Sequence, residues 1–155
     1  MIIMVGMPAS GKTTFVTQYL LPKGYVHINR DTLKTQPKCL KMTKEALHNK
    51  KSVVIDNTNP SVEARSHYIQ VAKSFSIPCR CFLMSTPMKL AAHLNGYREN
   101  KSNYQIKRIP ETAYNVYESK FEKPKESEGF TEIRKINFVP VFENDKDKQI
   151  FLQFT

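Results

Sequence analysis

The stretch Gly6-Met7-Pro8-Ala9-Ser10-Gly11-Lys12-Thr13 constrains the fold of this chain more than any other feature of its sequence. It matches the pattern G-x-x-x-x-G-K-[ST], in which a glycine-rich loop wraps a phosphate with backbone N–H groups at a helix N-terminus. The apolar run Ile2–Val5 precedes the loop, and a helical pattern from Lys12 to about Leu21 follows it. The pattern therefore has the strand–loop–helix setting that it requires, and it predicts a site for a nucleoside triphosphate.

Length and composition exclude several classes of protein. The 155 residues are 40% hydrophobic and 25% charged, as in an ordinary globular domain. No apolar run reaches the roughly 18 residues that cross a bilayer, and the opening Met1–Val5 stretch lacks the basic flank of a signal peptide. Three cysteines, an odd number, argue against a disulfide scaffold and fit a reducing compartment. We therefore expect one soluble domain over residues 1–155, with no membrane partner.

Short apolar runs alternate with helical patterns along the chain. Strands are predicted at Ile2–Val5, Tyr25–Ile28, Ser52–Ile55, Cys79–Met84 and Glu132–Phe138. Helices are predicted at 12–21, 37–48, 61–75, 86–97, 110–121 and 146–154, the third, fourth and fifth beginning at Ser61, Thr86-Pro87 and Pro110. This alternation predicts an α/β three-layer sandwich around a mostly five-stranded parallel sheet. Ligands of such sheets bind beyond the carboxyl ends of the strands, here after Val5, Ile28 and Ile55.

The chain has a surplus of positive charge, with 24 Lys+Arg, 14 Asp+Glu and a formal net charge of +10. Residues 1–78 hold 11 basic and 4 acidic residues, whereas residues 79–155 hold 13 and 10. The densest run extends from Lys34 to Lys51, where Glu45 is the sole acidic residue. Two interpretations stay open for this run, a solvated helix face or a surface that binds nucleic-acid phosphates.

The segment after Ile28 is Asn29-Arg30-Asp31. A hydroxyl that accepts a phosphoryl group needs a carboxylate to orient it and to take its proton. Asp31 could supply that carboxylate beside the phosphate loop. It could equally cap a short helix, although Thr32 could take over the cap.

The segment after Ile55 is Asp56-Asn57-Thr58-Asn59. An apolar strand that ends in Asp is the Walker B pattern, whose carboxylate holds Mg²⁺. Mg²⁺ ligands are thus expected from Asp56 and the hydroxyl of Thr13, while Lys12 would reach the β- and γ-phosphates. Asn57 and Asn59 either bind substrate or form the turn before Pro60.

Four cations, Arg98, Lys101, Lys107 and Arg108, lie in a polar stretch before Pro110. Mobile cations on a lid often neutralise charge on a transferring phosphoryl group. Spacing does not select one of the four, and all could be surface charges on a loop.

Three segments together resemble a known family. They are Gly-x-Pro-x-x-Gly-Lys-Thr, then Tyr25-Val26-His27-Ile28-Asn29-Arg30-Asp31-Thr32, then Val53-Val54-Ile55-Asp56-Asn57-Thr58-Asn59-Pro60. They resemble the kinase domain of polynucleotide kinase-phosphatases, and the likeness continues through Tyr97-Arg98-Glu99 and Glu128-Gly129-Phe130. It covers nearly the whole chain and implies a P-loop kinase fold with a helical lid at about residues 96–122.

The resemblance implies transfer of the ATP γ-phosphate to the 5′-hydroxyl of DNA, or of RNA, during strand-break repair. Catalytic roles would fall to Asp31 as general base, to Lys12 and to the lid residue Arg98. ATP would contact Gly6, Pro8, Ala9, Ser10, Gly11, Lys12, Thr13, Thr14 and Arg98. The nucleic-acid strand would contact Arg30, Asp31, Lys34, Asn57 and Asn59. The family has a second lid arginine where this chain has Gly96, and Lys101 is a candidate to compensate.

Some expectations concern partners and location. The family's phosphatase motif and phosphopeptide-binding module are not found in this chain. Two interpretations stay open: the chain is a cut-out or naturally separate kinase part, or such domains and a repair scaffold lie outside it. We expect a monomer in the nucleus, with the cytoplasm or mitochondria as alternatives. Two other functions stay open, a kinase for a sugar or nucleoside and a nucleic-acid-binding module with a non-catalytic nucleotide pocket. A GTPase is disfavoured, because no Asn-Lys-x-Asp motif occurs.

Overall fold

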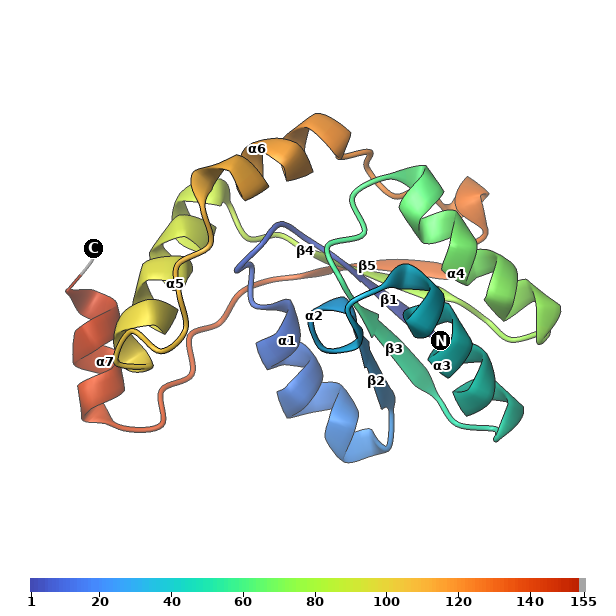
Figure 1. Cartoon of the computed structure of the whole chain (residues 1–155), viewed down its shortest axis with the longest axis horizontal. Helices are drawn as coiled ribbons and strands as arrows, with labels where there is room; N and C mark the ends of the chain where they lie inside the picture. Colours follow the sequence, from blue (N-terminus) through green and yellow to red (C-terminus); the bar gives the residue numbers. More distant parts are fainter. Residues whose placement is uncertain (154–155) are drawn as a thin grey trace.

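The computed structural model describes residues 1–153 and contains one sheet of five parallel strands (Figure 1). The strands are β1 (Ile2–Val5), β2 (Val26–Asn29), β3 (Val53–Asp56), β4 (Arg80–Met84) and β5 (Glu132–Ile136). Their order across the sheet is β2-β3-β1-β4-β5, so the strand that precedes the phosphate-binding motif lies in the centre. The predicted five-stranded parallel sheet is confirmed.

Within residues 1–153, seven α-helices cover the sheet and extend beyond it (Figure 1). Their bounds are α1 (Lys12–Phe15), α2 (Arg30–Leu33), α3 (Gln36–His48), α4 (Val62–Ser74), α5 (Met88–Lys101), α6 (Glu111–Lys120) and α7 (Asp145–Leu152). One π-helical turn (Val16–Leu20) and a 3-10 turn (Leu21–Lys23) continue α1, and a second 3-10 turn (Glu126–Glu128) precedes β5. None of the helices in residues 1–153 is long and apolar enough to cross a membrane.

The central strand is buried on both of its faces. Ile3 and Val5 pack on one face with apolar residues of α3 and α4, while Ile2 and Met4 pack on the other with the turn after α1. Successive side chains of a strand point to opposite faces, so a strand buried on both sides must be apolar throughout. This requirement explains the continuous apolar run that precedes the phosphate-binding motif.

The ends of the helices confirm some sequence predictions and correct others. Ser61 caps α4, since its hydroxyl accepts the N–H of Ala64 at 3.1 Å. Neither Asp31 nor Thr32 caps the short helix after β2; the side chain of Asn29 does so. This correction follows from geometry, because the cap residue must still have the extended backbone of the strand.

The start and end of α5 also differ from the prediction. Pro87 is the N-cap, and Thr86 does not cap the helix, because its hydroxyl donates to the carbonyl of Ser10 at 2.8 Å. The helix continues to Lys101, four residues past the predicted end at Tyr97. Arg98 therefore lies on a helix and not in a loop.

The segment expected to form the lid, residues 96–122, comprises the second half of α5, the turn after it and α6. Figure 1 shows α5 and α7 at the left of the sheet and α3 and α4 at its right, with α6 running above the sheet from α5 toward α4. The predicted final helix is α7, from Asp145 to Leu152; the predicted end at Phe154 lies outside the described residues.

Candidate active site

The loop between β1 and α1 has a shape that only glycine permits at two positions. Gly11 has a φ of +92°, in the left-handed region that residues with a Cβ rarely adopt. A Cβ on Gly6 would lie 2.7 Å from Ser10 Oγ and 2.9 Å from Met84 Cβ, closer than real contacts. The two glycines of the motif are thus required by packing at Gly6 and by the backbone at Gly11.

Lys12 lies inside this loop. Its Nζ donates to the carbonyl oxygens of Gly6 at 2.8 Å and Met7 at 2.7 Å. Burial lowers the pKa of the ammonium group to about 8, an effect that the carboxylates of Asp56 and Asp31 partly oppose. The site therefore holds a buried cation whose pKa lies well below that of an exposed lysine.

Asp56 ends β3, and its carboxylate is almost fully buried. Its Oδ2 accepts a hydrogen bond from Thr13 Oγ1 at 2.8 Å, so the two predicted Mg²⁺ ligands are neighbours. The same oxygen lies 2.8 Å from His27 Nε2 and accepts a hydrogen bond from Asn29 Nδ2 at 3.2 Å. Three elements thus meet at one carboxylate oxygen.

His27 and Asn29 were not among the predicted site residues. They are two residues apart on β2, so their side chains point to the same face, and Asn29 pairs with Asp56 in the parallel register. Polar residues at alternate positions of an otherwise apolar strand were the available signal for this contact.

Asp31 lies on α2 at the opening of the site, and its side chain is exposed. Its backbone N–H donates to Asn29 Oδ1 at 2.8 Å, whereas its carboxylate accepts no hydrogen bond within residues 1–153. The carboxylate is therefore not consumed by a helix cap and is available to a hydroxyl group.

Asn57 and Asn59 hold backbone groups in place. Asn57 Oδ1 accepts the N–H of Arg30 at 2.8 Å, which ties the end of β3 to α2. Asn59 is buried, and its Nδ2 donates to the carbonyl of Met4 at 2.7 Å. These contacts explain why the chain needs amides here, and direct binding of substrate by either side chain stays a prediction.

One cavity of about 1240 Å³ brings most of the predicted residues together. Its walls include the phosphate loop, the end of β3, α2, one face of α5 and the segment 138–143. The predicted residues that line it are Pro8, Ala9, Ser10, Gly11, Lys12, Thr13, Thr14, Arg30, Asp31, Asp56, Asn57, Asn59 and Arg98. Gly6 and Lys34 are not among the lining residues; Lys34 is exposed at the end of α2.

The four cations of the predicted lid have different surroundings. Arg98 and Lys101 line the cavity, and the Nε of Arg98 is buried without a hydrogen-bond partner in the described residues. Lys101 is 2.9 Å from Asp147 and 3.2 Å from Glu143, and the bond to Asp147 raises its pKa. Arg108 pairs with Glu99, and Lys107 and Arg108 do not line the cavity.

Gly96 and Arg98 face different ways. A Cβ on Gly96 would lie 3.4 Å from the guanidinium of Arg108, outside the cavity. Two residues along a helix correspond to a rotation of about 200°, so these two positions point in nearly opposite directions. In this structure a longer side chain at residue 96 would therefore point away from the cavity that Arg98 lines.

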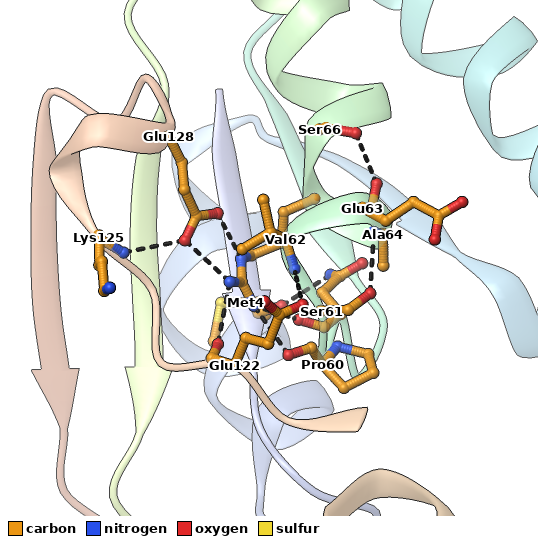
Figure 2. Close-up of polar contacts among 12 residues, drawn as sticks. Met4, Pro60, Ser61, Val62, Glu63, Ala64, Ser66, Glu122, Lys125 and Glu128 are labelled. Atoms are coloured by element: carbon orange, nitrogen blue, oxygen red, sulfur yellow. Dashed lines mark hydrogen bonds and ion pairs between the residues drawn. The ribbon is translucent and has the colours of Figure 1, made fainter. Parts of the chain in front are cut away.

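A buried arginine, absent from the predicted site, fixes the loop after β3. Figure 2 shows three of its partners, Pro60, Glu122 and Glu128, close together. Arg65 of α4 pairs with Glu128, with its Nε 2.8 Å from Oε2 and its Nη2 2.9 Å from Oε1. The remaining guanidinium N–H groups donate to three carbonyl oxygens, those of Asn59, Pro60 and Glu122. One side chain thus joins the end of α6 to the loop beside Asp56. A lone arginine on the otherwise apolar face that α4 buries was the signal in the sequence.

The fold and the loop define the class of this molecule, a P-loop domain with a large cavity at the carboxyl ends of its parallel strands. A family model described as "AAA domain" matches residues 1–38 and 34–124. The chain belongs to this AAA-domain family.

Two relatives confirm the family resemblance drawn from the motifs. The chain is 43% identical over its full length to a "Putative bifunctional polynucleotide phosphatase/kinase" of Acanthamoeba polyphaga mimivirus. It is 42% identical, over 88% of its length, to the "Bifunctional polynucleotide phosphatase/kinase" of Schizosaccharomyces pombe. The matches span 38% and 33% of the length of these relatives.

The fold also recurs in solved structures. Kti12 of Chaetomium thermophilum, in complex with ADP-AlF3, aligns with 98% of this chain and 95% of its own chain. The TM-score is 0.66 at 18% sequence identity, so the likeness concerns the fold alone.

Proposed function

We propose that this chain is an ATP-dependent polynucleotide 5′-hydroxyl kinase that acts on DNA ends, with RNA ends as a further substrate. The observation that supports it most is the exposed carboxylate of Asp31 in the same cavity as the phosphate loop and Arg98. A donor phosphate on the loop and an acceptor hydroxyl at Asp31 would thus lie in the same cavity. The relatives named polynucleotide phosphatase/kinase support the choice of a polynucleotide as acceptor.

ATP would bind with its phosphates in the loop between β1 and α1. The N–H groups of the loop and the ammonium of Lys12 would neutralise the β- and γ-phosphates. Arg98 would add a second cation from α5, because its buried Nε has no partner among the described residues. Stabilising charge on the transferring group is the main task of a protein in phosphoryl transfer.

Thr13 and Asp56 are suited to hold Mg²⁺. Their oxygens lie 2.8 Å apart, and hydroxyl and carboxylate oxygens are ligands that Mg²⁺ prefers. Residues 1–153 contain no group of three or more His, Cys, Asp or Glu side chains that could hold a metal ion. This fits Mg²⁺, which is commonly held by one or two protein ligands together with substrate phosphates. When bound, it would neutralise phosphate charge.

Asp31 would orient the 5′-hydroxyl and accept its proton as the hydroxyl oxygen attacks the γ-phosphorus. The bond between the γ-phosphorus and the bridging oxygen of ADP breaks as the new P–O bond forms. Arg30 lies beside Asp31 on the cavity wall and would contact phosphates of the acceptor strand. Lys34, one turn further, would contact the strand outside the cavity.

The acceptor strand would approach over α3. Lys38, Lys41 and Lys44 are exposed along this helix, which begins two residues after the end of α2, the helix that carries Asp31. Of the two interpretations of the basic run, we favour the surface for phosphates, because the run begins beside the proposed acceptor site.

The proposal also covers the extent of the domain, its lid, its oligomeric state and its place in the cell. Residues 1–155 would act as one kinase domain in which 96–122 closes as a lid over ATP. The protein would be a monomer that works in strand-break repair in the nucleus. Because the matches span only about a third of the relatives named phosphatase/kinase, a phosphatase domain would lie outside these residues.

Transfer of labelled γ-phosphate from ATP to four matched acceptors tests the proposal. The acceptors are a 5′-OH oligodeoxynucleotide, its RNA equivalent, a recessed duplex end and a free nucleoside. We expect the oligonucleotides to be phosphorylated far faster than the nucleoside. Equal rates on the nucleoside would indicate a small-molecule kinase, and ATP binding without transfer would indicate a non-catalytic nucleic-acid-binding module.

A further inference from the structure

Asn29 is the last residue of β2 and contacts both acidic residues of the site. Its Nδ2 donates to Asp56 Oδ2 at 3.2 Å, and its Oδ1 accepts the backbone N–H of Asp31 at 2.8 Å. The orientation of this amide is fixed by chemistry, because a carboxylate can only accept and a backbone N–H can only donate. One planar group therefore links the proposed Mg²⁺ ligand to the helix that carries the proposed base.

We propose that Asn29 is a positioning residue that holds Asp56 and Asp31 in a fixed relation to each other. The inference rests on the proposed kinase function, since that function gives the two carboxylates their separate tasks. A nucleophile and a phosphate must meet with sub-ångström accuracy, so a shared support for the two halves of the site contributes directly to the rate.

The sheet gives Asn29 this position. β2 and β3 are parallel neighbours, and Asn29 pairs with Asp56 at their carboxyl ends. His27, on the same face of β2, and Thr13, on α1, also contact Asp56 Oδ2. Among these three partners of the carboxylate, Asn29 is the one that also caps α2.

α2 depends on such contacts because it has only four residues. A helix this short is not stable through its own hydrogen bonds. The N–H groups of Arg30 and Asp31 are satisfied by two amide oxygens, from Asn57 and Asn29 respectively. The ends of β3 and β2 thus hold the start of α2, and Asn29 holds the residue that bears the proposed base.

Two variants of Asn29 separate its two contacts. Asn29→Ala removes both, whereas Asn29→Ser keeps a hydroxyl that can cap α2 but cannot reach Asp56. Ser61→Ala is the matched control, since it deletes the cap of α4 and touches neither carboxylate. The thermal midpoint of each variant shows that it folds.

Two measurements require no acceptor and no catalysis. The first is the gain in affinity for a fluorescent ATP analogue on adding Mn²⁺ as a probe for the Mg²⁺ site. The second is hydrogen exchange of the Asp31 amide, read by NMR. We expect both Asn29 variants to reduce the Mn²⁺-dependent gain about tenfold or more, the usual effect of removing a partner of a metal ligand. Only Asn29→Ala should accelerate the exchange, by about tenfold or more, while Ser61→Ala should change neither.

Each combination of results decides whether Asn29 positions the two carboxylates. The proposal stands only if the Mn²⁺-dependent gain falls in both Asn29 variants and the exchange rises in Asn29→Ala alone. Any other pattern overturns it, including a wild-type chain whose nucleotide affinity does not respond to Mn²⁺. Failure of the wild-type chain to phosphorylate any 5′-OH acceptor would instead contradict the proposed function, and the two measurements would still decide the role of Asn29.

In an active wild-type chain, kinetics add a third criterion. Asn29→Ala should lower kcat by about 10-fold to 100-fold, in line with the effects of mutating groups that orient metal ligands. Asn29→Gln, which keeps both donor and acceptor on a longer stem, should recover part of that activity. A kcat of Asn29→Ala within about threefold of the wild-type value would overturn the proposal. So small a loss lies well below the usual effect of mutating groups that orient metal ligands.

Discussion

At the scale of single residues, the site depends on charged groups that the protein holds in unusual surroundings. Lys12 is a buried cation surrounded by carbonyl oxygens, and Arg98 has a buried nitrogen without a partner in the described residues. Asp31 is the opposite case, an exposed carboxylate that makes no hydrogen bond there. In the proposed function, each of these groups would gain a partner from an anion or a hydroxyl that enters the cavity.

Nucleotide affinity should fall as the pH rises above about 8. Burial lowers the pKa of Lys12 to about 8 in the unliganded chain, and only its protonated form attracts phosphate. A bound triphosphate raises that pKa again, so binding above pH 8 takes up a proton and weakens by up to about tenfold per pH unit. Calorimetry in buffers of different ionisation enthalpy counts the proton. Lys12→Met should show no such uptake, and zero uptake by the wild type at a pH just above that pKa would contradict the assignment.

Asp31→Asn should lower kcat for 5′-OH oligonucleotides by at least about 100-fold, the typical contribution of a general base. Affinity for ATP should stay close to that of the wild type, because Asp31 lies on α2 and not in the phosphate loop. Rapid-quench transfer and equilibrium nucleotide binding measure the two quantities separately. Asp145→Asn, an exposed aspartate at the start of α7, is the control. Near-normal transfer by Asp31→Asn would show that another group takes the proton.

At the scale of elements, buried side chains join the ends of strands and helices. The clearest case is Arg65, which links α4 to the loop after β3 and to the segment after α6 (Figure 2). A guanidinium has five N–H donors, and here its three nitrogens all donate to Glu128 or to carbonyl oxygens. These bonds hold the C-terminal end of the predicted lid, at Glu122, against the loop beside Asp56.

Glu128→Gln should destabilise the chain by about 3–5 kcal/mol, since it leaves the buried guanidinium of Arg65 without its counter-charge. Both side chains of this pair are almost fully buried. Glu45→Gln is the matched control, because Glu45 pairs with Lys41 on the surface and such pairs contribute under about 1 kcal/mol. Urea denaturation compares the two variants. Equal destabilisation in both would show that the buried pair is no more important than the exposed one.

At the scale of the whole molecule, charge is distributed unevenly over the fold. The exposed lysines of α3 follow the proposed acceptor site, while α7 lies at the far side of the molecule (Figure 1). Lysines that bind phosphates release counterions, so their contribution is measured by the salt dependence of binding.

The double variant Lys38→Gln/Lys41→Gln should weaken oligonucleotide binding and reduce its dependence on salt. We expect the slope of log K against log[salt] to fall by about 1 for each phosphate that the variant no longer binds. Lys146→Gln/Lys148→Gln removes the same charge from α7 and should leave the slope unchanged. Binding titrations between about 50 and 200 mM salt make the comparison. Equal slopes in all three proteins would indicate that α3 is a solvated face.

Much of the architecture is predictable because periodicity and local signals suffice for it. The three central strands, β3, β1 and β4, are mostly apolar runs. Each predicted strand lies within one residue of the observed one, except that β5 ends at Ile136 and not at Phe138. The cap at Ser61 is predictable for the same reason, since a cap bonds to a residue three positions away. The cap at Asn29 is not, because Asp31 and Thr32 are equally good candidates in the sequence alone.

Local spacing along the chain is enough to identify the phosphate loop and the α/β alternation, and it makes Lys12, Thr13, Asp31 and Asp56 candidates for the site. The residues that support them emerge only from the folded arrangement. His27 and Asn29 reach Asp56 from 29 and 27 positions away, and Arg65 reaches Glu128 across 63 positions. The parallel sheet brings such distant positions together, because each strand is separated from its neighbours by a whole helical connection. No local pattern therefore records which distant partner a polar side chain will find.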